Sequence, residues 1–253
     1  MAIVTNDRCT VYISSCDKYS DLWRPFFILF GKYWPDCPYP VVLGAESKPL
    51  DKLFVKPYDN ALKATVQDVR CPRNCDPLAS IPWGLLTMNM LDNIDTEYVL
   101  FMLDDFFISK PVDQAMLTQC LDWMDADPAI GCFVVKPFPL ADSVESPYPP
   151  FRMAAEGAEQ RVTTHAAVWR KGVLRRSIRP LDNPWRWEAE AARRVSLQRD
   201  ETYYLDWDYT DHAAIDYPPV GALSKGYLTA AGRQVLADNG IENTLAAFRM
   251  RMV

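Results

Sequence analysis

The chain has 253 residues, of which 49% are hydrophobic, which is enough for one sizeable core in a single domain. Its formal net charge of -6 excludes a general basic surface for nucleic acid. The N-terminus lacks the pattern of a signal peptide, and no run of about 18 apolar residues could span a bilayer. We therefore expect a cytoplasmic protein with no nucleic-acid partner.

The seven cysteines are odd in number and irregular in spacing. A disulfide framework or a zinc site normally has paired cysteines at regular spacings. We expect free thiols, as in a reducing compartment.

The first half of the chain alternates between strand patterns and helix patterns. Short runs rich in β-branched and aromatic residues predict strands, and apolar residues at helical spacing predict helices. The predicted strands are 9–15, 40–44, 64–69, 98–103 and 130–135, and the predicted helices are 19–33, 82–94 and 111–126. This alternation predicts an α/β fold with a mostly parallel central sheet and helices on both faces.

The second half has a different pattern. Residues 137–160 hold several prolines and charges and predict a long loop. Beyond it we expect strands at 162–169 and 202–207 and helices at 171–178, 184–194 and 228–239. Asn183 is placed to cap the helix that Pro184 begins.

Two carboxylates, Asp104 and Asp105, follow the predicted strand 98–103 directly. In an open α/β sheet, ligands bind outside the carboxyl ends of the strands. A carboxylate at the edge of a core needs a hydrogen-bond donor, a basic side chain or a cation. The pair therefore marks a candidate site for a divalent metal and an anionic ligand.

Several segments between residues 13 and 227 carry a family resemblance. They are 15–23 with the following Phe26-Phe27, 32–40, 97–107, 166–170 and 183–188. Together they resemble a bacterial family of GT-A-type glycosyltransferases. The resemblance implies a single GT-A-like, Rossmann-like domain over 1–253, with a donor half at 1–136 and an acceptor half at 137–253.

The implied activity is transfer of a sugar from a nucleotide-diphosphate sugar to an acceptor hydroxyl. Such transfer often serves surface polysaccharide assembly. The implied partners are a nucleotide-sugar donor, with uridine as a guess for the base, and a glycan or lipid-linked acceptor.

By resemblance, Asp104 and Asp105 correspond to an Asp-x-Asp-type metal element, although here the acids are adjacent and Phe106 fills the third position. Neighbouring strand residues point to opposite faces, so the two acids cannot both ligate one ion unless the strand has already turned. We therefore expect Asp105 to ligate Mn²⁺ or Mg²⁺ and Asp104 to contact the ribose or an ordered water. Alternatively, one of them caps the following loop. His212 could be a further metal ligand, or a histidine hydrogen-bonded at the surface.

The turn after the first strand is the candidate nucleotide site. Ser14, Ser15 and Asp17 offer hydroxyl and carboxylate groups to a base and ribose, although one of them could simply cap the next helix. Asp68 is a weaker candidate for base binding. Lys225 could reach a diphosphate as a point charge, or could be merely exposed.

Glu188 is the candidate catalytic base, because transfer with inversion needs a carboxylate to take the proton of the acceptor hydroxyl. We expect it on the first turn of its helix, where it could instead only stabilise the helix. Trp185 and Trp187 flank it and could bind the acceptor, since aromatic faces suit sugar rings, or they could be ordinary core or interface residues. Trp83, which lacks the family's following arginine, is expected to be a packing residue.

Basic residues gather between 170 and 194. They favour solvated helix faces, with peripheral contact to the inner face of a membrane as the alternative. His165 is expected to be a hydrogen-bonded residue rather than a ligand.

Two other functions stay open. A nucleotidyltransferase also uses strand-end carboxylates and a divalent ion, but it usually opens with a Gly-rich loop, and residues 13–20 contain no glycine. A non-catalytic nucleotide- or sugar-binding protein on the same fold is the second alternative.

Overall fold

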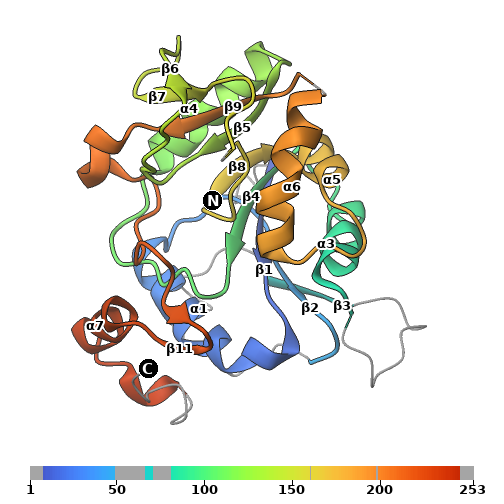
Figure 1. The fold of residues 1–253 in the computed structure, drawn as a ribbon. Helices are drawn as coiled ribbons and strands as arrows, with labels where there is room; N and C mark the ends of the chain where they lie inside the picture. The colour runs from blue at the N-terminus through green and yellow to red at the C-terminus, as the bar shows by residue number, and fades with distance from the viewer. Residues whose placement is uncertain (1–7, 49–65, 71–80, 160, 198, 246–253) are drawn as a thin grey trace, which may run out of the picture.

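The computed structural model describes residues 8–48, 66–70, 81–159, 161–197 and 199–245. Within this part of the chain, one nine-stranded sheet has the order β3-β2-β1-β4-β8-β5-β9-β7-β6. All strands of this sheet run in one direction except β8 and β7. The predicted α/β class with a mostly parallel central sheet is confirmed (Figure 1).

The parallel part of the sheet comes from the first half of the chain. It consists of β1 (Cys9–Ser14), β2 (Val41–Ala45), β3 (Val66–Arg70) and β4 (Tyr98–Leu103). In register, Val11 of β1 lies beside Val41 of β2 and Leu100 of β4. These strands read as apolar runs because both faces of the sheet are covered. Their carboxyl ends meet at one edge.

The remaining strands come from both halves of the chain. β8 (Ala167–Arg170) lies antiparallel between β4 and β5 (Ile130–Val134), and β9 (Glu201–Leu205) runs parallel to β5. β6 (Ser143–Val144) and β7 (Phe151–Ala154) form the edge. The prediction of one long loop over 137–160 is thus wrong in part, because β6 and β7 lie within it. The strand predicted to begin at residue 162 is β8, which begins at Ala167.

Helices cover both faces of the sheet (Figure 1). α1 (Trp23–Tyr33) and α4 (Gln114–Ala126) contribute to one buried apolar cluster, and α3 (Trp83–Asp92), α5 (Lys171–Ser177) and α6 (Pro184–Leu197) contribute to the other. A short 3₁₀ helix, η1 (Asp17–Leu22), joins β1 to α1. None of the helices in the described ranges has the length and apolar character needed to cross a membrane.

Capping residues fix where two of these helices begin. Asp113 accepts a hydrogen bond from the backbone N–H of Met116, so α4 begins at Gln114 rather than at the predicted Pro111. Asn183 accepts from the backbone N–H of Arg186 at 2.8 Å, and α6 begins at Pro184 as predicted.

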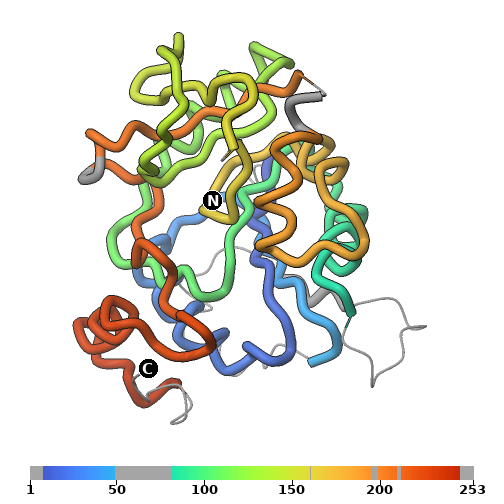
Figure 2. Tube along the Cα trace, in the orientation of Figure 1, coloured from blue at the N-terminus to red at the C-terminus, as the bar shows by residue number. Residues whose placement is uncertain are grey.

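The C-terminal part returns to the N-terminal part of the chain (Figure 2). After η3 (Trp207–His212), a hairpin of β10 (Leu223–Ser224) and β11 (Tyr227–Leu228) leads into α7 (Ala230–Asp238) and η4 (Glu242–Thr244). Asn239, after α7, accepts hydrogen bonds from Lys32 and Tyr33 of α1. This return places the hairpin beside the carboxyl ends of the parallel strands.

Candidate active site

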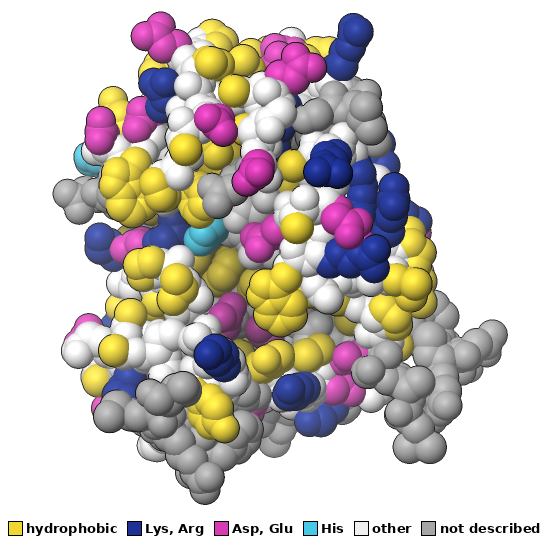
Figure 3. Space-filling model, in the orientation of Figure 1, with side chains coloured by type: hydrophobic (Ala, Val, Ile, Leu, Met, Phe, Trp, Pro, Cys, Tyr) yellow, Lys and Arg dark blue, Asp and Glu magenta, His cyan; other side chains and the backbone are white. Residues whose placement is uncertain are grey.

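A cleft of about 1680 Å³ opens at the carboxyl ends of β1, β2 and β4. The segments 163–165 and the first turns of α6 form its opposite side, and residues 219–226 close its lower edge. Acidic side chains gather in a recess on this face of the molecule (Figure 3). The volume exceeds the roughly 300–1,000 Å³ of common ligand pockets, so the cleft has room for more than one small molecule.

The acidic pair lies in a turn, not on a strand. β4 ends at Leu103, and the backbone N–H of Phe106 donates to the carbonyl of Leu103 at 3.2 Å. Asp104 and Asp105 are the central residues of this turn, and both line the cleft. The strand has therefore already turned at the acidic pair, so the alternation of strand faces does not separate the two side chains.

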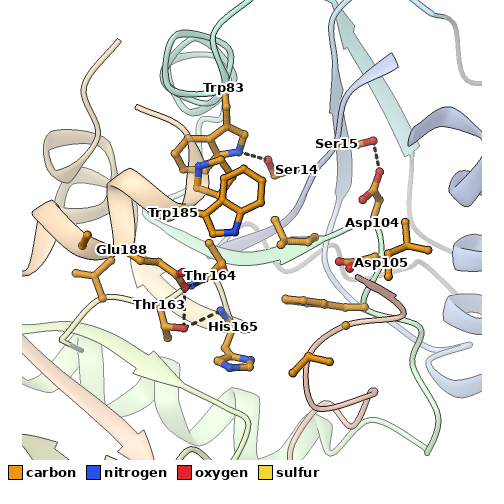
Figure 4. Close-up of a pocket in the computed structure, with 18 of the residues that line it drawn as sticks. Ser14, Ser15, Trp83, Asp104, Asp105, Thr163, Thr164, His165, Trp185 and Glu188 are labelled. Carbon is orange, nitrogen blue, oxygen red and sulfur yellow. Dashed lines mark hydrogen bonds between the residues drawn. The ribbon is translucent and has the colours of Figure 1, made fainter. Parts of the chain in front are cut away.

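Asp104 is held by the end of β1. Its side chain is buried and accepts a hydrogen bond from the hydroxyl of Ser15, which in turn accepts from Trp23 Nε1 at 2.7 Å. The neighbouring Ser14 hydroxyl accepts from Trp83 Nε1 at 3.0 Å (Figure 4). Ser14, Ser15 and Asp104 thus form one side of the cleft with fixed orientations.

Asp105 lies against the C-terminal hairpin. Its carbonyl accepts from the backbone N–H of Ala222 at 2.8 Å. Burial raises the pKa of the Asp105 carboxyl to about 6, and a hydrogen bond from the backbone of Leu223 opposes this rise. A carboxylate that burial destabilises in this way gains from a nearby cation.

The donor set fits one kind of metal site. Among the described residues, no group of three or more His, Cys, Asp or Glu side chains comes together to hold a metal ion. Asp105 and Asp104 supply carboxylate oxygens only. This fits a hard cation such as Mn²⁺ or Mg²⁺ that takes its other ligands from phosphate oxygens and water, and it does not fit a cage built from protein ligands alone.

Glu188 lies across the cleft from the acidic pair (Figure 4). Its Oε1 atom accepts from the hydroxyls of Thr163 and Thr164, at 3.1 and 2.9 Å, and from the backbone N–H of Thr164. Its Oε2 atom has no hydrogen-bond partner in the part of the chain that the structure describes. Glu188 is the fifth residue of α6, so the predicted place on the first turn is wrong.

The two predicted acceptor tryptophans differ completely in exposure. Trp185 lines the cleft and is 76% exposed. Trp187 is 0% exposed, packs against Trp83 with ring centroids 5.6 Å apart, and donates to the Ser177 hydroxyl. Residues two apart on a helix lie on opposite sides of it. Trp187 is thus a core residue with no face for a sugar, and Trp83 packs on it as expected.

Two of the predicted site residues, Asp17 and His212, are not among the residues that line the cleft. The Asp17 carboxylate accepts from the backbone N–H groups of Ser47 and Lys48 and stabilises that turn. His212 is exposed at the end of η3 and is not one of the cleft residues. The backbone of Asp68 pairs with Leu43 in the sheet, whereas its side chain lies outside the described part of the structure.

Lys225 does lie at the cleft. It is exposed in the turn between β10 and β11, where Lys225 and Gly226 both have positive φ. Tight hairpin turns of this kind favour glycine at such positions. This turn places Lys225 among the residues that line the cleft.

Several cleft residues were not among the predicted site residues: Glu46, His165, Arg193 and Gly221. Glu46 directly follows β2, and its position at the carboxyl end of a predicted strand could have indicated a cleft residue. The other three come from segments whose positions depend on contacts that are distant in sequence.

The basic residues at 170–194 are mostly paired. The ion pairs are Arg170–Glu97, Arg175–Asp92, Arg176–Asp200, Arg186–Glu190 and Arg194–Asp182. This pairing favours the interpretation as helix faces over a surface for lipid headgroups.

No family model matches the chain, and no curated protein matches it by sequence. Solved structures do match. TarS from S. aureus superimposes with a TM-score of 0.52 at 14% identity, over 79% of this chain and 35% of the TarS chain. The fold is that of the GT-A glycosyltransferases.

Two further GT-A structures are similar. One is the mannosyltransferase PcManGT from Pyrobaculum calidifontis with GDP-Man and Mn²⁺, with TM-score 0.49, 16% identity, and coverage of 77% of this chain and 53% of that one. The other is the galactosyltransferase LgtC with donor and acceptor sugar analogs, with TM-score 0.49, 11% identity, and coverage of 94% and 96%. Nucleotidyltransferases are also among the neighbours. The chain spans about a third of TarS and about half of PcManGT.

Proposed function

We propose that this protein transfers a sugar from a nucleoside-diphosphate sugar to an acceptor hydroxyl, with the help of a divalent cation. The observation that carries the proposal is one cleft with two chemically different sides. The acidic pair and the serines after β1 lie on one side, and Glu188 and Trp185 lie on the other. A donor and an acceptor need such a pair of adjoining subsites.

The donor would occupy the side formed by the strand ends. Ser14, Ser15 and Asp104 are placed to bind the nucleoside, with Asp104 contacting the ribose. Asp105 would hold Mn²⁺ or Mg²⁺ together with the diphosphate, and Lys225 would add a positive charge nearby. The cation, when bound, neutralises the negative charge that grows on the diphosphate as it leaves.

The acceptor would occupy the side formed by α6. The acceptor oxygen attacks the anomeric carbon of the sugar, the bond from that carbon to the diphosphate oxygen breaks, and the hydroxyl proton passes to Glu188 Oε2. The hydrogen bonds from Thr163 and Thr164 hold the other oxygen of Glu188 and so aim Oε2. The exposed indole of Trp185 offers a flat surface for a sugar ring.

The acceptor we propose is a glycan or a lipid-linked sugar of surface polysaccharide assembly, and the donor we propose is a uridine nucleotide sugar. Membrane contact through residues 170–194 is not part of the proposal, because most of those basic residues are paired.

Thermal unfolding with UDP, GDP, UDP-glucose and GDP-mannose, each with and without MnCl₂, tests the proposal. A ligand at about 100 times its Kd should raise Tm by roughly 5–10 °C for a chain of this size. We expect a shift with one base that needs Mn²⁺ and disappears in Asp105→Asn. Asp142→Asn, at an exposed loop position away from the cleft, is the matched control. No shift with any nucleotide would refute the proposed donor site.

A further inference from the structure

His165 has a fixed partner on one side of its ring. Its Nδ1 atom lies 3.0 Å from the hydroxyl oxygen of Tyr217. The same oxygen accepts a hydrogen bond from the backbone N–H of Ala166, also at 3.0 Å. Tyr217 is almost fully buried, and its hydroxyl has no other partner in the described part of the chain.

This geometry determines which ring nitrogen carries the proton. The Tyr217 hydroxyl has a single proton, and Nδ1 of His165 is the acceptor within reach. If Nδ1 carried a proton and donated it to Tyr217, the buried hydroxyl proton would have no acceptor, which is costly. Nδ1 therefore accepts, and in the neutral ring the proton lies on Nε2.

The surroundings keep the ring neutral and fixed. Burial, with a smaller effect from the charge of Lys136, lowers the pKa of His165 to about 4. The Lys136 ammonium lies 4.4 Å from the centroid of the Tyr217 ring and is paired with Asp216 at 2.9 Å. The Phe106 ring stacks on Tyr217, with centroids 4.1 Å apart, and Phe138 packs against the imidazole.

The free side of the ring belongs to the cleft. His165 lines the cleft, and its Nε2 atom has no hydrogen-bond partner among the described residues. Nε2 is not among the buried polar atoms that lack a partner, so it is accessible from the cleft. The residue stands between the two sides of the cleft. It directly follows Thr163 and Thr164, which hold Glu188 (Figure 4). Its ring faces that of Phe106, which directly follows Asp105 in the chain, with ring centroids 6.4 Å apart.

We propose that the Nε2–H group of His165 donates a hydrogen bond to a hydroxyl oxygen of the transferred sugar. The inference rests on the proposed function. A nucleotide sugar with its diphosphate at Asp105 and its anomeric carbon near Glu188 would have its sugar between these two residues. An uncharged donor of fixed direction suits a hydroxyl lone pair, and it adds no charge to the site. Tyr217 is then a positioning residue, which acts by fixing the tautomer of His165.

The ring state can be measured without any substrate. The chain has only two histidines, His165 and His212, so protein labelled with nitrogen-15 histidine gives two pairs of ring-nitrogen signals, which His212→Gln assigns. Long-range proton–nitrogen correlation at neutral pH should show the Nε2–H tautomer for His165. In Tyr217→Phe this preference should weaken. A His165 ring with its proton on Nδ1 would overturn the inference even if the protein is a glycosyltransferase.

Contact with the sugar is tested by the difference between each nucleotide sugar and its parent nucleotide. We would titrate UDP, UDP-glucose, GDP and GDP-mannose into the protein with MnCl₂ by calorimetry. His165→Phe should leave the nucleotide Kd unchanged and raise the nucleotide-sugar Kd roughly two- to tenfold, the range for one hydrogen bond. His165→Gln, whose amide can accept from Tyr217 and also donate, should recover part of the loss.

The control is His212→Gln, at the exposed end of η3, which should change neither Kd. An equal effect of His165→Phe on nucleotide and nucleotide sugar would overturn the contact with the sugar while leaving the proposed function intact. A wild-type protein that binds none of the four compounds would overturn the proposed function and, with it, this contact.

Discussion

Gly221 lies directly against the carboxylate of Asp105. A Cβ atom at Gly221 would fall 2.4 Å from Asp105 Oδ2 and 3.0 Å from its Cγ. The φ angle of Gly221 is +78°, in the region that side chains rarely adopt. The C-terminal hairpin can therefore close on the acidic pair only with glycine at this position.

Gly221→Ala should lower stability and impair binding at the acidic pair. The left-handed backbone costs roughly 1–2 kcal/mol for a residue with a Cβ, and displacement of the Asp105 carboxylate adds to this. Gly240→Ala is the matched control, because Gly240 also has positive φ, at +64°, with nothing within 4 Å of a Cβ. We expect both variants to unfold at lower urea concentration, but only Gly221→Ala to lose the Mn²⁺-dependent nucleotide shift. Equal nucleotide shifts in the two variants would show that the close approach to Asp105 has no role in binding.

Trp185 and Trp187 should respond to truncation in opposite ways. Trp187 is fully buried and contacts Trp83 and Trp169, so Trp187→Ala should cost about 3–5 kcal/mol of unfolding free energy. Trp185 is 76% exposed, so Trp185→Ala should change it by less than about 0.5 kcal/mol. Urea unfolding at equilibrium measures both. A large loss of stability in Trp185→Ala would mean that this side chain is structural and not free to bind an acceptor.

Local sequence patterns were sufficient for most of the fold. The apolar runs of β1 and β4 and the Asn183 cap of α6 are strong local signals, and the structure confirms them. The short strands β6 and β7 were missed because each is too brief to show a period of two residues.

The site was less predictable for two physical reasons. The alternation rule places Asp104 and Asp105 on opposite faces only while the strand continues, and the turn closed by Phe106 ends it. In contrast, helical geometry alone could have separated Trp185 from Trp187, since α6 presents them on different sides. The pairing of His165 with Tyr217 joins residues 52 apart in sequence, so no local pattern predicts it.

Glu188→Gln should slow turnover strongly and spare donor binding. The amide oxygen can still accept from Thr163 and Thr164, but the side chain can no longer take a proton. We expect kcat to fall by roughly 10²–10⁴ with the nucleotide-sugar Kd unchanged. Glu190→Gln, on the same helix and paired with Arg186 outside the cleft, should keep full activity. A fully active Glu188→Gln enzyme would remove Glu188 from the role of base.

The neutral His165 ring should make stability depend on pH. An unfolded histidine binds a proton below its ordinary pKa of 6.5, whereas the folded ring, beside Tyr217 and Lys136, binds one only near pH 4. Between these values the unfolded chain holds the extra proton. The neutral His165 ring therefore makes its full contribution to the free energy of unfolding above pH 6.5. As the pH falls towards 4, the free energy of unfolding decreases by roughly 3 kcal/mol because of this group.

The pH effect is isolated by comparing wild type with His165→Gln, because other titrating groups such as Asp105 contribute equally to both. The difference in unfolding free energy between the two proteins should be constant above pH 6.5 and shrink or reverse below it. Parallel curves across this range would show that His165 is protonated in the folded protein as easily as in the unfolded chain.

The proposed transfer breaks the bond between the anomeric carbon of the sugar and the diphosphate oxygen. Incubation of UDP-glucose and GDP-mannose with the protein and MnCl₂ in oxygen-18-labelled water, followed by mass spectrometry, shows which bond is broken. We predict a nucleoside diphosphate and a sugar carrying the label, with release strongly reduced in Glu188→Gln. A nucleoside monophosphate with a sugar phosphate, or a label on phosphorus, would mean attack within the diphosphate and would rule out the proposed sugar transfer.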